Sequence, residues 1–472
     1  MRRMKTDLCA LSATELLAGY RNQSISPVEA TKAALARIRK LNPVLNAFCL
    51  VDERAALASA RASEARWMKG KPIGLVDGVP TTIKDLILTK GWPTRRGSRT
   101  VDAKGPWKDD APCVARLREH GAVLLGKTTT PEFGWKGVTD NPLTGITRNP
   151  WNPEKTPGGS SGGASAATAA GMGALSIGTD GGGSIRIPCS FTGLFGIKAS
   201  FGRVPAWPLS PFGTVAHVGP MTRTVADAAL MLNVISRPDA RDWYSLPYDE
   251  RDYTVGLEDG VRGLHIAFSA DLGYAKVDRE VAAIVKRAVQ RFVDLGAHVE
   301  AKDPGFEDLG PLFAAHWYTG AAYVVRGIAP EKRKLVDPGL LEIAEQGSRL
   351  GTMEYLDAVT RRVALGAQMR AFHRKFDLLV TPTLAVPAFE AGSEVADPRR
   401  QKRWIDWTPF SLPFNLTQQP AATINCGFTK SGLPVGLQIV GPMHADALVL
   451  RAARAFETVY PARMPDLSKL RR

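Results

Sequence analysis

Three consecutive glycines, Gly181, Gly182 and Gly183, stand directly before a serine, Ser184. Such a run costs backbone entropy on folding, so it needs a physical reason. A tight turn is one explanation. The other is a nest of backbone N–H donors beside a nucleophile, because glycine lets a reacting carbonyl approach the backbone and the N–H groups then stabilise an oxyanion. The pattern alone leaves both explanations open.

A serine hydroxyl is a weak nucleophile and needs a base. None of the seven histidines stands in a local context typical of a catalytic base. A lysine can serve instead if burial keeps its amine neutral. Lys84 is a candidate, because an uncharged stretch precedes it and an apolar one follows Asp85. The alternative is a lysine at a strand end that faces solvent.

A second serine motif, from Gly159 to Gly163, contains Ser160 and Ser161 and matches the G-x-S-x-G pattern of esterases. That pattern requires a strand before the serine and an Asp and a His later in the chain. The preceding ten residues, 148–157, contain three prolines and are poor strand material. A Ser-His-Asp esterase that uses Ser161 is therefore only a remote alternative.

A third motif, from Gly121 to Thr128, matches the spacing of a phosphate-binding loop. Such a loop needs exposed backbone N–H groups that wrap the phosphates. Here the run Ala122–Leu125 is apolar and predicts a buried strand. We therefore expect no nucleotide site, with Lys127 at the end of that strand.

The wider pattern predicts an α/β fold, because short apolar strands alternate with helices from residue 74 onward. We expect a helical segment over residues 1–65 that packs on a single domain over residues 66–472. Capping boxes at Ser12 and Ser26 begin two of its helices, the second ending near Asn42-Pro43. Further helices are predicted over 53–69 and 112–120, from 130, across most of 305–375 and over 446–457. Strands are predicted over 79–87, 122–126, 376–388 and 433–442, and residues 280–300 are predicted to form a helix followed by a strand.

The composition is that of an ordinary globular protein, with a formal net charge of +15. Lys and Arg are scattered, and the densest basic groups, 399–403 and 470–472, are short. This favours a solvated surface over a nucleic-acid interface. The five cysteines are odd in number, widely spaced and without a CxxC pair, which indicates a reducing compartment and no zinc site. We find no signal peptide and no run of about 18 apolar residues, and so expect a cytoplasmic protein without a membrane span.

Taken together, these stretches resemble the amidase signature family. The resemblance rests on GVPTTIKD around Lys84, GKTTTPEF at 126–133, RNPWNPEKTPGGSSGGASAA at 148–167, GTDGGGSIRIPCSFTGLFGIK at 178–198 and LPVGLQIVGP at 433–442. It spans about residues 26–457. It implies a large, mixed, twisted sheet covered by helices on both faces. Thr129 and Ala199 depart from the family's usual asparagine and proline.

The resemblance also implies roles. Ser184 is the nucleophile, Ser160 the relay on a cis peptide bond, and Lys84 the base. The N–H groups of Gly181, Gly182, Gly183 and Ser184 form the oxyanion hole, and Asp180, Arg186 and Ser161 support the loop. No metal or organic cofactor is implied.

The family includes small-molecule amidases, carbamate cleavers and the amidotransferase subunit that makes glutaminyl-tRNA. Apolar and aromatic stretches around Trp207, Phe212, Trp317 and Tyr318 are candidate pocket walls, and they suit a small, neutral, hydrophobic or aryl amide. We therefore expect an amidase that acts alone or as a homodimer, with hydrolysis of carbamates as an extension. The alternative is a glutaminase subunit that works with a partner chain on aminoacyl-tRNA.

Overall fold

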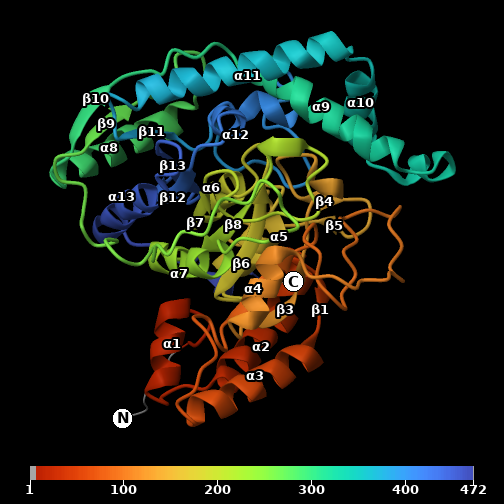
Figure 1. The fold of residues 1–472 in the computed structure, drawn as a ribbon, viewed down its shortest axis with the longest axis vertical. Helices are drawn as coiled ribbons and strands as arrows, with labels where there is room; N and C mark the ends of the chain where they lie inside the picture. The colour runs from red at the N-terminus through yellow and green to blue at the C-terminus, as the bar shows by residue number, and fades with distance from the viewer. Residues whose placement is uncertain (1–6, 471–472) are drawn as a thin grey trace.

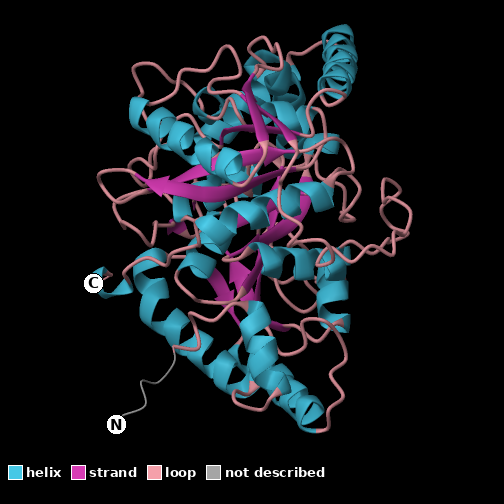
Figure 2. Ribbon diagram, turned by 90° about the vertical axis from the view of Figure 1, so that its left-hand side faces the viewer, coloured by secondary structure: helices cyan, strands magenta, loops and turns pink. Residues whose placement is uncertain are grey.

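The computed structural model describes residues 7–470, so the basic start of the chain (residues 1–6) and residues 471–472 of the C-terminal basic group lie outside the described residues. Eleven strands form one mixed sheet in the order β1-β3-β2-β6-β8-β7-β12-β13-β11-β9-β10. Helices cover both of its faces (Figures 1 and 2). The predicted fold class is therefore confirmed.

The strands are β1 Phe48–Val51, β2 Pro80–Lys84, β3 Val123–Thr128, β6 Leu175–Asp180, β7 Phe195–Lys198, β8 His217–Thr222, β9 His265–Phe268, β10 His298–Ala301, β11 Leu378–Pro382, β12 Ala421–Phe428 and β13 Pro434–Val440, with the small pair β4 Asp140–Asn141 and β5 Gly145–Ile146 apart from the sheet.

The helices are α1 Ala13–Arg21, α2 Pro27–Leu45, α3 Glu53–Met68, α4 Pro112–Glu119, α5 Gly162–Ala169, α6 Arg186–Thr192, α7 Val225–Ile235, α8 Arg279–Asp294, α9 Gly310–Arg326, α10 Pro338–Ser348, α11 Thr352–Phe372, α12 Leu412–Leu416 and α13 Asp446–Val459. Short 3-10 turns occupy Glu132–Gly134, Gly213–Val215, Pro330–Leu335, Trp404–Trp407 and Leu467–Lys469. No helix within residues 7–470 combines the length and apolar character that a membrane span requires.

The sheet is buried on both faces, because successive apolar side chains along its strands enter two different cores. On β11, Leu378 and Val380 join the core that contains α7, α8 and α13, whereas Leu379 joins the aromatic-rich core under α9, α10 and α11. Successive side chains of a strand point to opposite faces, so a fully apolar strand fits only a sheet covered on both sides. A third core packs α2 and α3 against α5.

Both predicted capping boxes are present. The side chains of Ser12 and Glu15 satisfy each other's backbone N–H at the start of α1, and Ser26 and Glu29 do the same at α2. The predicted end of the second helix is wrong by a few residues, because α2 contains Pro43 and continues to Leu45. The division into a segment over 1–65 and a domain over 66–472 stays a prediction.

Two further expectations were wrong. Strand β1, inside the region expected to be helical, pairs antiparallel with β3. The helix expected from residue 130 is only a 3-10 turn, because Phe133 (φ 51°) and Gly134 (φ 75°) adopt left-handed backbone that ends a helix.

The run Ala122–Leu125 is buried, as expected, and Lys127 is buried within β3. The Lys127 ammonium donates to the Ile87 carbonyl and the Thr94 hydroxyl. This stretch therefore presents no exposed loop that could wrap phosphates.

Candidate active site

The site lies at one edge of the sheet. Strand β2 pairs parallel with both β3 and β6, so the carboxyl ends of these strands lie side by side. Lys84 is the last residue of β2 and Asp180 the last of β6. The glycine turn begins directly after Asp180, and Ser160 and Ser161 directly precede the buried helix α5. In open α/β sheets this edge commonly carries ligand sites.

Lys84 is completely buried and faces three hydroxyl groups. Its Nζ lies 2.7 Å from Ser160 Oγ, 2.8 Å from Ser161 Oγ and 2.8 Å from Thr179 Oγ1. Within residues 7–470, no carboxylate forms an ion pair with it. A neutral amine has two N–H donors and one lone pair, so it can satisfy three hydroxyls by donating twice and accepting once.

Burial lowers the pKa of Lys84 well below its ordinary value, and the charge of Asp180 offsets only part of that effect. The cause is desolvation, because a buried ammonium loses its hydration without gaining a paired carboxylate. Lys84 therefore has the character of a base that can accept a proton from a neighbouring hydroxyl.

The two serine segments contact each other. The Ser161 N–H donates to the Ser184 carbonyl at 3.2 Å. The Gly159–Ser160 peptide is cis, as the resemblance implied. A Cβ at Gly159 would lie 2.5 Å from the Val138 carbonyl oxygen, so only glycine fits there. Hydrogen bonding and close packing thus hold both serines in place.

The glycine turn presents most, but not all, of its N–H groups. The Gly183 N–H donates to Asp180 Oδ1 at 2.8 Å. This differs from the expectation that all four N–H groups are available to an oxyanion. The N–H groups of Gly181, Gly182 and Ser184 form no hydrogen bond to any other residue in the described part of the chain. Three donors therefore remain beside the Ser184 hydroxyl.

Aromatic side chains explain two of the glycines. A Cβ on Gly181 would lie 2.8 Å from the Trp317 ring, and one on Gly182 would lie 2.6 Å from the Trp404 ring. Gly183 has φ 115°, a conformation that other residues rarely adopt. The glycine run is thus required both by its backbone and by the aromatic wall behind it.

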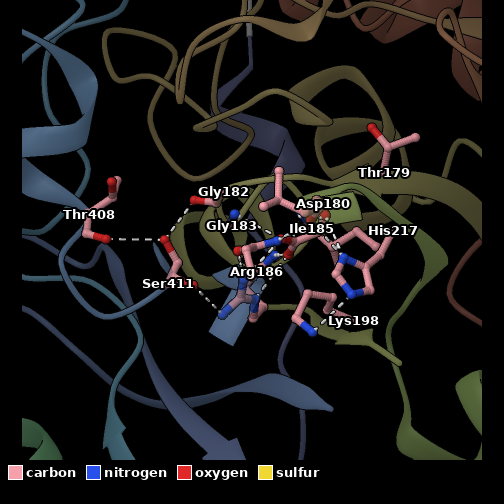
Figure 3. A network of polar contacts seen from close by, with 12 residues as sticks. Thr179, Asp180, Gly182, Gly183, Ile185, Arg186, Lys198, His217, Thr408 and Ser411 are labelled. Atoms are coloured by element: carbon pink, nitrogen blue, oxygen red, sulfur yellow. Dashed lines mark hydrogen bonds and ion pairs between the residues drawn. The ribbon is translucent and has the colours of Figure 1, made fainter. Parts of the chain in front are cut away.

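A buried ion pair supports this turn (Figure 3). Arg186 donates to both Asp180 oxygens, at 3.0 Å from Nε and 2.9 Å from Nη2. The same guanidinium donates to Asn415 Oδ1 at 2.6 Å, to Gln438 Oε1 at 2.8 Å and to the Ser411 carbonyl at 3.2 Å. Ser411 Oγ in turn donates to the Gly182 carbonyl at 2.7 Å. Both charges are therefore fully paired although neither is exposed.

Burial alone would raise the pKa of Asp180, but the charge and hydrogen bonds of Arg186 outweigh it and hold that pKa below its usual range. Asp180 thus stays ionised and can accept from Gly183. The sequence motifs predict Asp180 and Arg186 as supports of the turn, but they do not predict Ser411, Asn415 and Gln438. Of these three residues, only Gln438 lies in one of the family motifs, LPVGLQIVGP, so only Gln438 was predictable from the sequence.

His217 was also missed as a cavity residue. Its Nδ1 lies 2.8 Å from the Val215 carbonyl and 3.2 Å from the Asp180 carbonyl, so Nδ1 carries the proton. Its Nε2 faces Lys198 Nζ at 3.5 Å. Burial, reinforced by the nearby Lys198, lowers the pKa of His217 and keeps it neutral.

No histidine in the described residues hydrogen-bonds Ser161. Instead, the Ser161 hydroxyl contacts Lys84 Nζ and the backbone of Thr179. The esterase arrangement at Ser161 is therefore not formed.

A cavity of about 710 Å³ opens onto these residues and is lined by Ser160, Thr179, Gly181 and Ser184 at the site. Of the predicted wall residues, Trp207, Phe212 and Trp317 line it. Phe212 and Trp317 stack with ring centroids 3.8 Å apart. Tyr318 is half-buried but is not among the lining residues of this cavity, because neighbouring residues on α9 point in different directions.

Within residues 7–470, no group of three or more His, Cys, Asp or Glu side chains is placed to bind one metal ion.

Comparisons with known proteins agree with this geometry. Residues 29–450 match the family model described as Amidase. The chain is 39% identical to an acylamidase of Rhodococcus erythropolis, with 96% of each chain covered. It is also 39% identical to a glutamyl-tRNA(Gln) amidotransferase subunit of Myxococcus xanthus, covering 96% of this chain and 97% of that one.

Among solved structures, a bacterial aryl acylamidase of the amidase signature family superposes with a TM-score of 0.89 at 33% identity, and 96% of each chain is covered. The family model and these relatives extend over nearly the whole chain, and the Lys84–Ser160 contact and the glycine turn lie inside the matched region. The chain therefore belongs to the amidase signature family and is an amidohydrolase that acts on carbon–nitrogen bonds.

Proposed function

We propose that the chain hydrolyses small aliphatic or aryl amides through an acyl-enzyme on Ser184, with Ser160 as relay and Lys84 as base. The observation that carries this proposal is the buried Lys84 amine, which lies 2.7 Å from Ser160 Oγ and has no carboxylate partner in the described chain. Such a lysine can hold a lone pair near neutral pH, which an exposed lysine cannot.

In the acylation step, Ser184 Oγ attacks the amide carbonyl as its proton passes to Ser160 Oγ and that of Ser160 passes to Lys84. The oxyanion receives hydrogen bonds from the N–H groups of Gly181, Gly182 and Ser184. These donors are fixed before the reaction and belong to a buried turn, where N–H groups stabilise charge more strongly than they do in water. Asp180, Arg186 and Ser161 hold the turn in this geometry.

The tetrahedral intermediate then collapses, and the carbon–nitrogen bond breaks as Ser160 gives a proton to the departing amine. Ser160 recovers its proton from the Lys84 ammonium. Water enters and loses a proton by the same route as it attacks the acyl-enzyme, which releases the acid and restores Ser184. Every proton that leaves a hydroxyl is returned, so the cycle needs no further reactant.

The pH profile tests Lys84. Because Lys84 must be neutral and burial lowers its pKa, kcat/KM rises with pH as the ammonium loses its proton, and then reaches a plateau. Activity is lost as pH falls through the pKa of Lys84. Stopped-flow acylation with an activated anilide measures the profile. A rate that falls as pH rises through neutrality contradicts a lysine base, and so does near-normal turnover by Lys84→Ala.

The cavity favours an uncharged, hydrophobic group at the acyl side, because Phe212 and Trp317 stack beside the glycine turn. The similarity to an acylamidase and to an aryl acylamidase supports the same substrate class. Carbamates with such groups fit the same wall.

We propose further that the chain acts in the cytoplasm, alone or as a homodimer, without nucleic acid. Its five unpaired cysteines support a reducing compartment.

Amine release by the isolated chain distinguishes a free-standing amidase from an amidotransferase subunit. We expect the purified chain to liberate aniline from acylanilides and ammonia from aliphatic amides, with a higher kcat/KM than for glutamine. The similarity to amidotransferase subunits defines the alternative outcome of this assay. Preference for glutamine, seen only after a second protein and tRNA are added, would assign the chain to the amidotransferase class.

A further inference from the structure

Arg96 is a cation in the wall of the cavity of about 710 Å³ that opens onto the candidate active site, and no described residue pairs with it. It lines that cavity together with Ser160 and Ser184. Its guanidinium forms no hydrogen bond or ion pair with any residue in 7–470. Its neighbour differs, because Arg95 Nε donates to the Val101 carbonyl at 3.1 Å. A half-buried arginine whose donors have no protein partner is available to a ligand.

The backbone holds Arg96 in an unfavourable conformation. Its φ is 56°, in the left-handed region that favours glycine. The Arg96 N–H donates to the Asp85 carbonyl at 3.1 Å, and the Arg96 carbonyl accepts from the Phe133 N–H at 2.8 Å. The Asp85 carboxylate also accepts from the flanking Arg95 and Gly97 N–H groups. Arg96 thus occupies a position where glycine would be less strained, which indicates that its side chain has a function there.

The charges nearby do not neutralise Arg96. Burial lowers the pKa of Arg96 and the Asp85 charge opposes this, yet Asp85 forms its ion pair with Lys127, at 3.9 Å. Arg326 and Lys332, which are exposed, also line the cavity. The one carboxylate among the described lining residues, Asp242, already accepts from the Ala206 and Tyr244 N–H groups. The cavity therefore presents excess positive charge.

The fold places Arg96 on the side of Ser160. The Phe133 N–H that binds Arg96 precedes Gly134, and a Cβ on Gly134 would lie 3.4 Å from Ser160 Oγ. The stacked ring of Trp317 instead lies against Gly181. In the proposed reaction Ser160 protonates the departing amine. The amine part of the substrate therefore extends toward Arg96, and the acyl part toward the aromatic wall.

We propose that Arg96 is a specificity-determining residue that binds a carboxylate on the amine part of the substrate. The substrate class is then extended to N-acyl amino acids and to acylanilides with an acidic ring substituent, while uncharged amides remain substrates. A guanidinium binds a carboxylate through two parallel hydrogen bonds, which an ammonium cannot match. This inference rests on the proposed hydrolysis and on Ser160 as the proton donor.

Two pairs of substrates test the role of Arg96. In each pair, one substrate carries a carboxylate where the other carries a methyl ketone of similar shape. The amine-side pair is 4-acetamidobenzoate and 4-acetylacetanilide. The acyl-side pair is succinanilate and 4-oxo-N-phenylpentanamide. We expect kcat/KM to favour the carboxylate by about 10- to 100-fold in the amine-side pair only, which is the range for a hydrogen bond to a charged group. Preference in the acyl-side pair, or in neither, overturns the inference.

Arg96→Gly is the decisive variant, because glycine relieves the left-handed strain while it removes the guanidinium. Its Tm should not fall, and the amine-side preference should disappear while the uncharged anilide is still cleaved. Arg99→Gln is the matched control, since Arg99 is exposed in the same loop and does not line the cavity. It should keep the preference. A preference that survives in Arg96→Gly, or that is lost in Arg99→Gln, contradicts a contact with Arg96.

Calorimetry separates this inference from the proposed hydrolysis. The leaving amine 4-aminobenzoate should bind Ser184→Ala protein at least tenfold more tightly than it binds the protein that also carries Arg96→Gly. This measurement needs no turnover. Failure of the wild-type chain to cleave any anilide would refute the proposed function, whereas equal binding by the two proteins would refute the role of Arg96.

Discussion

Replacement of Ser184 by alanine is expected to lower kcat by about 10⁴- to 10⁶-fold, the range that follows loss of a serine nucleophile. The fold should survive, because alanine fits wherever serine does and the Ser184 carbonyl that accepts from Ser161 is unchanged. Anilide hydrolysis and thermal unfolding, measured on the same preparation, check both statements. Activity should vanish while Tm moves by no more than a few degrees.

A fluorophosphonate probe gives an independent measurement. Mass spectrometry should show one covalently bound probe per wild-type chain, on the peptide that contains Ser184, and none on Ser184→Ala. Ser165→Ala is the matched control, because this buried hydroxyl in α5 donates only to the Gly162 carbonyl and the variant should stay active. Labelling of Ser160 or Ser161 in the wild-type chain would assign the nucleophile elsewhere.

The second large effect is expected on stability. Arg186→Met should lower the free energy of unfolding by about 3–5 kcal/mol, because it leaves the buried Asp180 carboxylate without its paired charge. The carbonyl of Ser411 and the side chains of Asn415 and Gln438 lose a donor at the same time. Urea unfolding measures the change. Hydrolysis should fall as well, since Asp180 holds Gly183 in the turn.

An exposed ion pair provides the comparison. Arg349 and Glu345 lie one helical turn apart and both are largely exposed. Removal of such a charge costs at most about 1 kcal/mol, so Arg349→Met should unfold almost as the parent chain does. If the two methionine variants lose similar stability, the Arg186 network does not have the structural role assigned to it.

The sequence predicted the fold class and the motifs that meet at the site, whereas several contacts around those motifs were not predictable. Ser160, Ser184 and Lys84 stand in short motifs whose residue types are specific. The structure brings Lys84, at the end of β2, within 2.7 Å of Ser160, in the loop before α5. The capping boxes at Ser12 and Ser26 were equally readable, because each depends on residues only three positions apart.

Features that depend on distant contacts were missed. Strand β1 is four residues long and lies between two helices, so its pairing with β3 leaves no local signal. The Thr-Pro-Glu start of the turn at Phe133 predicts a helix, because proline at the first helical position is a strong helix signal. The left-handed backbone of Phe133 and the Arg96–Phe133 hydrogen bond become visible only in three dimensions.

The order of the functional residues along the chain has an evolutionary consequence. The groups assigned to bond cleavage lie between residues 84 and 186, whereas much of the cavity wall comes from residues 201–212 and 317–332. Mutation of wall residues in the later segments that, unlike Trp317, do not pack against the glycine turn can therefore reshape recognition and leave the groups assigned to bond cleavage in place. Substrate preference can then change while the groups assigned to bond cleavage keep their positions. This fits the equal 39% identity to relatives named for an acylamidase and for an amidotransferase component.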